Sequence, residues 1–322
     1  MKAVQMAQTG GPEVLRYVDV PDPRPGPGQA LVGVKAIGVN YTDVYTRSGL
    51  NPPASLPAIP GVEAAGEVLE VGEGVTEVAV GDLVAYTGVP ASYAERVVAP
   101  AWRLVKLPPG ADAEVGAAAM LQGMTAHYLC HSTYPVQAGD TVLIHAGAGG
   151  VGLLLIQMCK WLGARVIATV STEAKAELAR GAGADHVVLY TQQDFEAEVQ
   201  RITEGAGVQV AYDSVGRTTF DKSMACLARR GYLVLFGQAS GPVAPVSPAA
   251  LNRKSLFLTR PTLVDYTATR EELLQRAGDV LGWVQEGRLR LRVSQRFPLR
   301  EAAEAHRLLE GRQTTGKLLL IP

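Results

Sequence analysis

The segment Gly147-Ala148-Gly149-Gly150-Val151-Gly152 constrains the fold of this chain more than any other feature. It has the pattern G-x-G-x-x-G and lies between an apolar, strand-like run at 141–146 and a helix-like run at 153–162. A second strand-like run follows at 165–170, which completes a strand–turn–helix–strand unit. In such a unit the glycines allow a tight turn, a close approach of a pyrophosphate and close helix–strand packing. The helix N-terminus also offers N–H groups to phosphates.

We therefore expect this turn to bind the pyrophosphate of a dinucleotide through Gly149, Gly150, Val151 and Gly152. The alternative is a glycine-rich turn without a ligand, because 35 of the 322 residues are glycine and chance matches occur. The position of the turn between a strand and a helix favours the dinucleotide.

Two patterns divide the chain. Residues 1–100 contain short apolar runs between Gly/Pro turns, which indicates a β-rich, barrel-like domain. From about residue 113 helical patterns appear, at 113–119 and 123–132, and strand-like and helix-like runs then alternate. Besides 141–146 and 165–170, the predicted strands are 186–190, 208–213, 232–237 and 256–260, and the predicted helices are 173–182, 194–204 and 218–229.

Six strands are the number in a complete doubly wound parallel sheet, so we predict an α/β fold with a Rossmann domain at 123–263. Residues 265–322 contain two more helical patterns, at 270–286 and 299–310, and end in an apolar run at 317–322. We place that run as a strand in the first domain, which then comprises 1–122 and 264–322.

Bulk properties exclude several classes of protein. The formal net charge is −1, which gives no general attraction to nucleic acid or anionic lipid. No apolar run reaches the ~20 residues of a membrane span, and the first residues lack the apolar region of a signal peptide. The three cysteines, Cys130, Cys159 and Cys226, are scattered, and we expect buried thiols in a reducing cytoplasm.

The end of the second predicted strand favours NADP(H) over NAD(H). An NAD-binding domain has an Asp or Glu there, bonded to the ribose 2′-hydroxyl. Here the strand ends in Val170-Ser171-Thr172, with no carboxylate, and Lys175 follows about one helical turn later. We expect Ser171 and Lys175 to bind the 2′-phosphate, and Glu173 to belong to the first turn of the next helix. The alternative is that Ser171 is a helix cap and Lys175 a solvated residue.

The motifs along the whole chain resemble the medium-chain dehydrogenase/reductase superfamily, and within it the quinone oxidoreductases, the group that includes zeta-crystallin. The resemblance is strongest to bacterial NADPH:quinone reductases, and it implies a GroES-like first domain beside the Rossmann domain. The matching motifs are GGPEVL at 10–15, AIGVNYTDVY at 36–45, RSG at 47–49, PGVEAAG at 60–66, GD at 81–82, HAGAGGVG at 145–152, YDSVG at 212–216 and Thr259-Arg260-Pro261.

The chain departs from the zinc-containing relatives of that superfamily. Zinc alcohol dehydrogenases carry Cys at the position of Asn40 and His at the position of Val62, and they have a four-cysteine lobe that is missing after Gly81-Asp82. A catalytic zinc site needs three protein ligands, and Glu63 alone supplies one. We therefore expect no metal, and a reaction with an electron-poor acceptor such as a quinone or an enone.

The resemblance also implies roles for individual residues. Asn40 and Tyr45 would face the nicotinamide between the domains, with Asn40 donating to a substrate carbonyl or holding the carboxamide, and Tyr45 orienting a quinone oxygen or supplying a proton. The alternatives are a turn residue for Asn40 and helix packing for Tyr45, and Asp43 fits a structural role as well as a chemical one. The remaining candidates for the cofactor site are Leu121, Thr125, Tyr190, Ser214, Phe236, Gly237, Gln238, Arg312 and Lys317.

Some of these candidates have competing interpretations. Gln122 lies beside Leu121 at the domain junction, but relatives often carry Lys there, which puts its role in doubt. Arg312 and Lys317 fit solvated surface charges equally well, and Tyr190 fits an aromatic residue at a strand end. His145, just before the glycines, is expected to be a hydrogen-bonded, half-buried residue.

The expected function is hydride transfer from NADPH to a quinone-type acceptor in the cytoplasm. Within the same class, the alternative is a zinc-free enone or 2-alkenal reductase, and from another class it is a nucleotide-regulated RNA-binding or structural protein. The near-neutral charge argues against RNA binding as the primary role. Strand 256–260 would be the exposed edge of the sheet, and the resemblance implies a homodimer that pairs across it.

Overall fold

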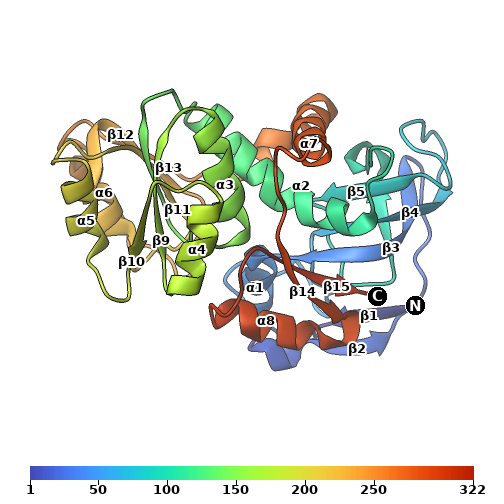
Figure 1. The fold of residues 1–322 in the computed structure, drawn as a ribbon. Coiled ribbons are helices and arrows are strands. Elements are labelled where there is room, and N and C mark those ends of the chain that lie inside the picture. Colours follow the sequence, from blue (N-terminus) through green and yellow to red (C-terminus); the bar gives the residue numbers. More distant parts are fainter. The chain divides into compact units, whose positions relative to one another are not determined.

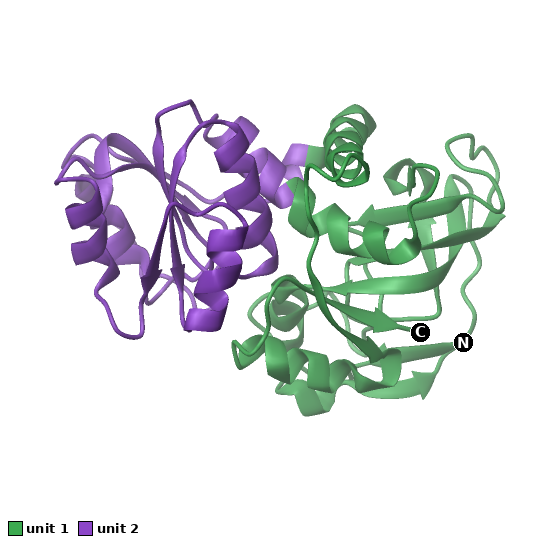
Figure 2. Ribbon diagram, in the orientation of Figure 1, with its two compact units in different colours: residues 1–124, 267–322 green, residues 125–266 purple.

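The computed structural model describes residues 1–322 and divides into two compact units (Figures 1 and 2). Unit 1 comprises residues 1–124 and 267–322, and unit 2 comprises residues 125–266. Unit 1 is therefore built from both ends of the chain, while unit 2 is a single continuous segment.

A six-stranded parallel sheet forms the centre of unit 2. Its strands are β8 (Thr141–Ile144), β9 (Arg165–Val170), β10 (His186–Leu189), β11 (Val208–Asp213), β12 (Leu227–Leu235) and β13 (Phe257–Thr259). Their order is β10-β9-β8-β11-β12-β13, and every neighbouring pair is parallel. This is the strand order of the doubly wound fold, which confirms the fold class expected from the sequence. The central strands are short and apolar because both faces of the sheet are covered.

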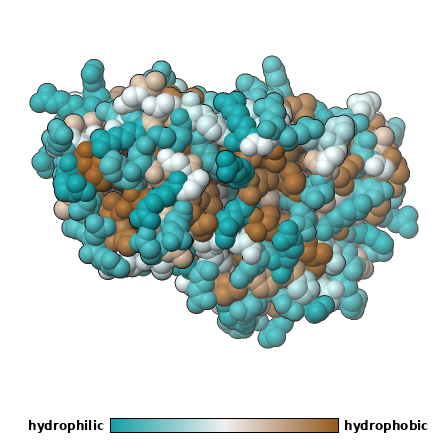
Figure 3. All heavy atoms as spheres, viewed as in Figure 1, coloured by the Kyte–Doolittle hydropathy of each residue, from teal (hydrophilic) through white to brown (hydrophobic).

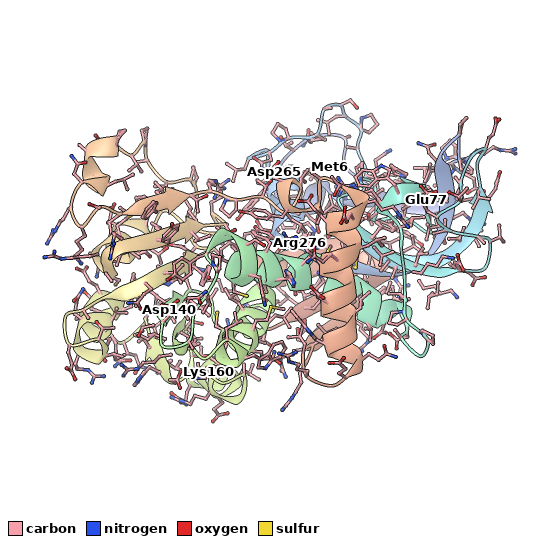
Figure 4. All side chains as sticks on the ribbon, turned by 90° about the horizontal axis from the view of Figure 1, so that it is seen from above. Met6, Glu77, Asp140, Lys160, Asp265 and Arg276 are labelled. Atoms are coloured by element: carbon pink, nitrogen blue, oxygen red, sulfur yellow. The ribbon has the colours of Figure 1, made fainter.

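Helices cover both faces of this sheet. Those that follow the first four strands are α3 (Gly150–Trp161), α4 (Glu173–Gly181), α5 (Phe195–Ile202) and α6 (Phe220–Ala225). Helices α3 and α4 pack together on one face, and α5 and α6 pack together on the other (Figure 1). Lys160, labelled in Figure 4, bonds to Ala164 O and Asp185 and so ties the end of α3 to the connections around β9.

The observed helices differ from the predicted ones in two places. The helix expected at 218–229 ends at Ala225, because Leu227 already pairs with Val208 and residues 227–235 form one long strand. The two helices expected at 113–119 and 123–132 are one, α2 (Ala113–Tyr128), which continues into a π-helical segment at Leu129–Thr133. No helix-breaking residue lies between the two predicted segments, so nothing in the sequence interrupts the helix.

Unit 1 is β-rich. Its strands are β1 (Lys2–Gln5), β2 (Arg16–Asp19), β3 (Gln29–Val39), β4 (Glu63–Val71), β5 (Leu83–Thr87), β6 (Arg96–Pro100), β7 (Val105–Lys106), β14 (Val293–Pro298) and β15 (Lys317–Ile321). Strands β1 and β2 form a hairpin, and the others form one sheet in the order β14-β15-β3-β4-β5-β7, with β6 also paired to β3. Its helices are α1 (Tyr41–Ser48), most of α2, α7 (Arg270–Gln285) and α8 (Ala302–Glu310).

Five short 3₁₀ helices complete the secondary structure. They lie at Pro12–Val14, Ala101–Arg103, Pro248–Leu251, Asp265–Thr267 and Leu299–Glu301. The last of these precedes α8, so the helical run expected at 299–310 consists of a 3₁₀ turn and an α-helix.

Strand β3 holds unit 1 together. It pairs antiparallel with β4, β6 and β15, and most of its residues are buried. The pairing with β15 confirms that the C-terminal run returns to the first part of the chain, since Leu318 lies opposite Val39. Strands β3 and β4 approach closely at Gly66, where an added Cβ would lie 2.0 Å from Gly33 O.

No helix is both long and apolar enough to cross a membrane. Hydrophilic side chains cover much of the face drawn in Figure 3, with apolar atoms between them.

Candidate functional site

The glycine-rich turn connects β8 to α3 at the middle of the parallel sheet. Gly147 N–H donates to Thr169 O at 3.0 Å, which ties the turn to β9, and Gly149 N–H donates to Ala146 O at 2.8 Å. Helix α3 begins at Gly150 with Gly149 as its N-cap. Strand β8 lies between β9 and β11, where the strand order reverses direction, and such a switch point is where ligands bind in doubly wound sheets.

Sterics explain two of the glycines. A Cβ at Gly152 would lie 2.3 Å from Ala146 O and 2.9 Å from Gly147 Cα, so only glycine lets α3 begin this close to the turn. A Cβ at Gly147 would lie 2.8 Å from Ala168 Cβ on β9. Gly149, Gly150 and Val151 are only half-buried, so their backbone can be reached by a ligand.

The N-terminus of α3 has no side-chain cap. The corresponding ends of α4 and α5 are capped by Thr172 and Asp194, which accept from backbone N–H groups of their own first turns. The first N–H groups of any α-helix lack partners within the helix. At α3 they remain for a phosphate, which the helix dipole also favours.

The end of β9 carries no carboxylate. The strand ends at Val170, and Thr172 rather than Ser171 is the cap of α4, so the alternative role considered for Ser171 is wrong. Glu173 is the first residue of α4, and its carboxylate pairs with Arg180 at 2.5 Å. Lys175 lies in the first turn of α4 and is half-buried.

Other predicted cofactor residues also follow strand ends. Tyr190 N–H donates to Val170 O at 3.1 Å, and its side chain is 37% exposed. Ser214 follows β11, and Phe236 to Gln238 follow β12. A Cβ at Gly237 would lie 2.6 Å from Ser214 O, so these two segments touch. Because the strands are parallel, all these residues belong to the same edge of the sheet as the glycine turn.

His145 lies directly before the turn and is held by hydrogen bonds at both ring nitrogens. It is fully buried rather than half-buried, and its ring nitrogens bond to Thr169 Oγ1 and Ser223 Oγ, each at 2.9 Å. Ser223 Oγ donates in turn to Asp213 Oδ2 at 3.0 Å. Burial lowers the pKa of His145, so the ring is neutral near pH 7. The expectation of a satisfied histidine is correct.

In unit 1, Asn40 lies between β3 and α1. Its side chain is 3% exposed and fully engaged. Nδ2 donates to Glu63 Oε2 at 2.7 Å and to Gly38 O at 3.1 Å, and Oδ1 accepts from Lys317 Nζ at 2.9 Å.

Lys317 is not a solvated surface charge. It is 2% exposed, and its ammonium forms an ion pair with Glu63, which is 0% exposed. Glu63 Oε1 also accepts from Leu121 N–H at 2.6 Å. A buried charge is costly unless it is paired and hydrogen-bonded, and here both charges are.

Asp43 begins a second buried network in unit 1. Its Oδ2 accepts from Asn40 N–H at 2.8 Å and from the Tyr93 hydroxyl at 3.0 Å, and that hydroxyl also lies 3.0 Å from His306 Nε2. Burial raises the pKa of the Asp43 carboxyl to about 7, although both hydrogen bonds oppose the shift. Burial also lowers the pKa of His306 to about 3, which keeps that ring neutral.

The remaining candidates lie as follows. Tyr45 is a half-buried residue of α1, and its ring centroid lies 5.5 Å from that of Tyr41. Leu121 is half-buried and Thr125 buried, both on α2. Arg312 is exposed and follows α8. No group of three or more His, Cys, Asp or Glu side chains is arranged to hold a metal ion.

Sequence reasoning missed the Lys317–Glu63 pair and the Asp43–Tyr93–His306 network. The only local signal for Lys317 is its position at the start of the run 317–321. The other four residues of this run are apolar, and three of them are buried in the strand. Glu63 gave a similar signal, because it precedes the buried small residues of β4.

A doubly wound sheet with an uncapped glycine turn, next in the chain to a β-rich unit built from both termini, defines a medium-chain dehydrogenase/reductase. Residues 26–109 match the family described as alcohol dehydrogenase GroES-like domain, and residues 150–279 match the family described as zinc-binding dehydrogenase.

Full-length relatives narrow the class. A quinone oxidoreductase of Pseudomonas aeruginosa is 47% identical over 100% of this chain and 99% of its own length. A 2-haloacrylate reductase of a Burkholderia species is 43% identical over 99% and 98%. The structure of Escherichia coli quinone oxidoreductase complexed with NADPH superposes with a TM-score of 0.98 at 42% identity, covering both chains completely. The chain belongs to the quinone oxidoreductase family.

The steric role of Gly152 gives a first prediction. Gly152→Ala forces a Cβ into the backbone of the turn, and we expect a loss of roughly 1–3 kcal/mol of stability together with loss of dinucleotide binding. Gly181→Ala is the control, because a Cβ there meets nothing within 4 Å. Denaturation midpoints and a dinucleotide titration measure both effects. Wild-type binding by the Gly152 variant would contradict the role of the turn.

The pKa of Asp43 gives a second prediction. This pKa is about 7 in the folded chain and has the ordinary value of 3.8 in the unfolded chain. Between about pH 4 and 7 the Asp43 carboxyl therefore stays protonated in the folded chain and is ionised in the unfolded chain. Stability therefore falls as pH rises through this window. The Asp43→Asn variant can still accept the hydrogen bonds from Asn40 N–H and the Tyr93 hydroxyl, but it does not titrate. The melting temperature of this variant should therefore rise relative to that of the wild type between pH 5 and pH 8. The exposed Asp221→Asn should show no such gain.

Proposed function

We propose that the chain transfers hydride from NADPH to a quinone-type acceptor. The choice of NADPH rests on the end of β9, which carries no carboxylate that could bind a ribose 2′-hydroxyl. The nearest acid, Glu173, is paired with Arg180. Ser171 and Lys175 then supply a hydroxyl and a positive charge to the 2′-phosphate. The E. coli relative solved with NADPH supports the same choice.

NADPH supplies the hydride when bound, and the residues of the chain bind and orient the cofactor. The free N–H groups at the start of α3, in Gly150, Val151 and Gly152, bind the pyrophosphate. Tyr190, Ser214 and the segment 236–238 border the nucleotide at the other strand ends. Leu121, Thr125, Arg312 and Lys317 complete the proposed cofactor site. Each of these roles is part of the proposal.

The chemistry is balanced without a metal. A quinone that accepts one hydride becomes a hydroquinone anion, and one proton completes the hydroquinone. Tyr45 is the proposed donor to the quinone oxygen, and Asn40 is proposed to contact the reacting groups. Positioning of donor and acceptor provides most of the rate increase in such a reaction.

A second acceptor class has support of its own. The Burkholderia relative is named a 2-haloacrylate reductase, and its substrate class is an activated alkene. Reduction of an alkene needs a proton at carbon rather than at oxygen. A steady-state panel of quinones and enones separates the two readings, and we expect the higher kcat/KM for quinones.

We also propose an assembly and a location. Strand β13 is the last strand of its sheet, and Phe257 on it is 46% exposed, which supports a homodimer formed by pairing this edge across a two-fold axis. A monomer in sedimentation at micromolar concentration would contradict the dimer. The three free thiols support a cytoplasmic location.

Lys175→Ala tests the cofactor. Loss of its charge should raise the KM for NADPH about tenfold with quinone as acceptor and leave the KM for NADH unchanged, since only NADPH carries the 2′-phosphate. Lys222→Ala removes an exposed lysine of α6 and should change neither value. An unchanged NADPH/NADH preference in the Lys175 variant would show that the 2′-phosphate is bound elsewhere.

A further inference from the structure

Asp213, the last residue of β11, organises the segment that follows it. Its side chain is 0% exposed. Oδ1 accepts from Val215 N–H at 2.8 Å and from Gly216 N–H at 3.0 Å, and the Thr219 hydroxyl lies 2.7 Å from Oδ2. One buried carboxylate therefore fixes the segment 214–219, whose first residue belongs to the proposed cofactor site.

The hydrogen bonds that join Asp213 to His145 run in one direction. A hydroxyl carries a single hydrogen, and Ser223 donates it to Asp213 Oδ2 at 3.0 Å. Toward His145 Nε2, which is 2.9 Å away, the Ser223 oxygen can then only accept, so Nε2 carries a hydrogen. Burial lowers the pKa of His145 and keeps the ring neutral, so Nδ1 carries none and accepts from the Thr169 hydroxyl at 2.9 Å.

This chain of hydrogen bonds crosses the parallel sheet at its switch point. Its members, none of them more than 2% exposed, are Thr169 on β9, His145 after β8, Ser223 on α6 and Asp213 on β11. At one end, Thr169 O accepts from Gly147 N–H of the glycine turn at 3.0 Å. At the other end, Asp213 holds the segment 214–219. The chain therefore joins the two segments that border the proposed nucleotide site in unit 2.

We infer that His145, as the Nε2–H tautomer, and Asp213 are positioning residues for the cofactor, which hold the glycine turn and the segment 214–219 in one fixed arrangement. The inference rests on the proposed function, which assigns both segments to the nucleotide. A site whose parts are already fixed binds more tightly, because less conformational freedom is lost on binding. Packing also fixes the imidazole, whose centroid lies 4.9 Å from that of Phe195 in an edge-to-face contact.

Stability alone does not explain this chain of hydrogen bonds. Burial of hydroxyls, an imidazole and a carboxylate costs desolvation free energy, and the hydrogen bonds among them mainly offset that cost. A polar network in which every bond is made instead gives the surrounding elements one arrangement. Here those elements carry the two segments of the proposed nucleotide site.

The first test measures the tautomer in the wild type. Two-bond ¹⁵N–¹H NMR correlations of a histidine ring distinguish Nε2–H from Nδ1–H, because the two ring nitrogens are distinct. The signals of His145 are those that disappear in His145→Gln. We expect the Nε2–H form near pH 7. An Nδ1–H ring or an imidazolium in the wild type would overturn the direction of the chain.

The second test measures positioning by equilibrium titration with two probes. NADP⁺ carries the pyrophosphate and the nicotinamide, whereas adenosine 2′-phosphate has neither. Ser223→Ala interrupts the chain at its middle, and we expect the Kd for NADP⁺ to rise about fivefold while that for adenosine 2′-phosphate stays unchanged. His145 should also change to the Nδ1–H tautomer in this variant, since Nε2 loses its acceptor and the Thr169 oxygen remains.

Thr203→Val is the matched control. The Thr203 hydroxyl donates to Val199 O at 2.8 Å and accepts from Gly207 N–H at 3.0 Å, between the end of α5 and the start of β11. It therefore lies at the opposite edge of the sheet from the glycine turn. Its loss should lower the melting temperature and leave the Kd values for both probes and the His145 tautomer unchanged.

A second variant covers the case in which Ser223→Ala does not fold. Thr169→Val keeps the shape of the side chain and interrupts the chain at its other end, so the same difference between the two probes is expected. An unchanged Kd for NADP⁺, or an equal loss for both probes, would overturn the positioning role. A wild type that binds neither probe would instead overturn the proposed function, so the two failures are distinguishable.

Discussion

The buried ion pair between Lys317 and Glu63 is the interaction on which unit 1 depends. It joins the start of β15 to the start of β4, and through Asn40 and Leu121 it reaches the end of β3 and helix α2. Neither charge has access to water, so each requires the other and the surrounding polar atoms. The arrangement of four elements around one point follows from that requirement, and Asn40 takes its orientation from it.

Unit 2 meets a different requirement in the proposed function, because its backbone has to approach a phosphate closely. Gly147 and Gly152 remove the side chains that would separate the turn from β9 and α3, and His145 fixes the turn from below through Thr169 and Ser223. Helices α4 and α5 close their own N-termini with Thr172 and Asp194, whereas α3 does not. In the proposed function, the absence of a side-chain cap at the start of α3 leaves backbone N–H groups for a phosphate.

Local patterns predicted much of this chain. Strands β9 and β11 have the predicted bounds, and the glycine turn lies where its motif places it, because periodicity and turn chemistry act over a few residues. The misplaced boundary near Leu227 depends on pairing with Val208, and the Lys317–Glu63 pair joins residues 254 positions apart. Such contacts come from tertiary structure, and a lysine at the start of an apolar run carries no local sign of its partner.

The position of Lys317 also affects how the chain is made. Synthesis runs from the N-terminus, and unit 2 is continuous from residue 125 to residue 266, so it is complete before residues 267–322 are synthesised. Unit 1 is completed later, since the counter-charge of Glu63 is Lys317, which is synthesised after the whole of unit 2. Until the ribosome releases that segment, the carboxylate of Glu63 has no cation and β3 lacks one of its three partners. Strand β15 is therefore added late to a buried cluster whose other members, Asn40 and Glu63, are synthesised early.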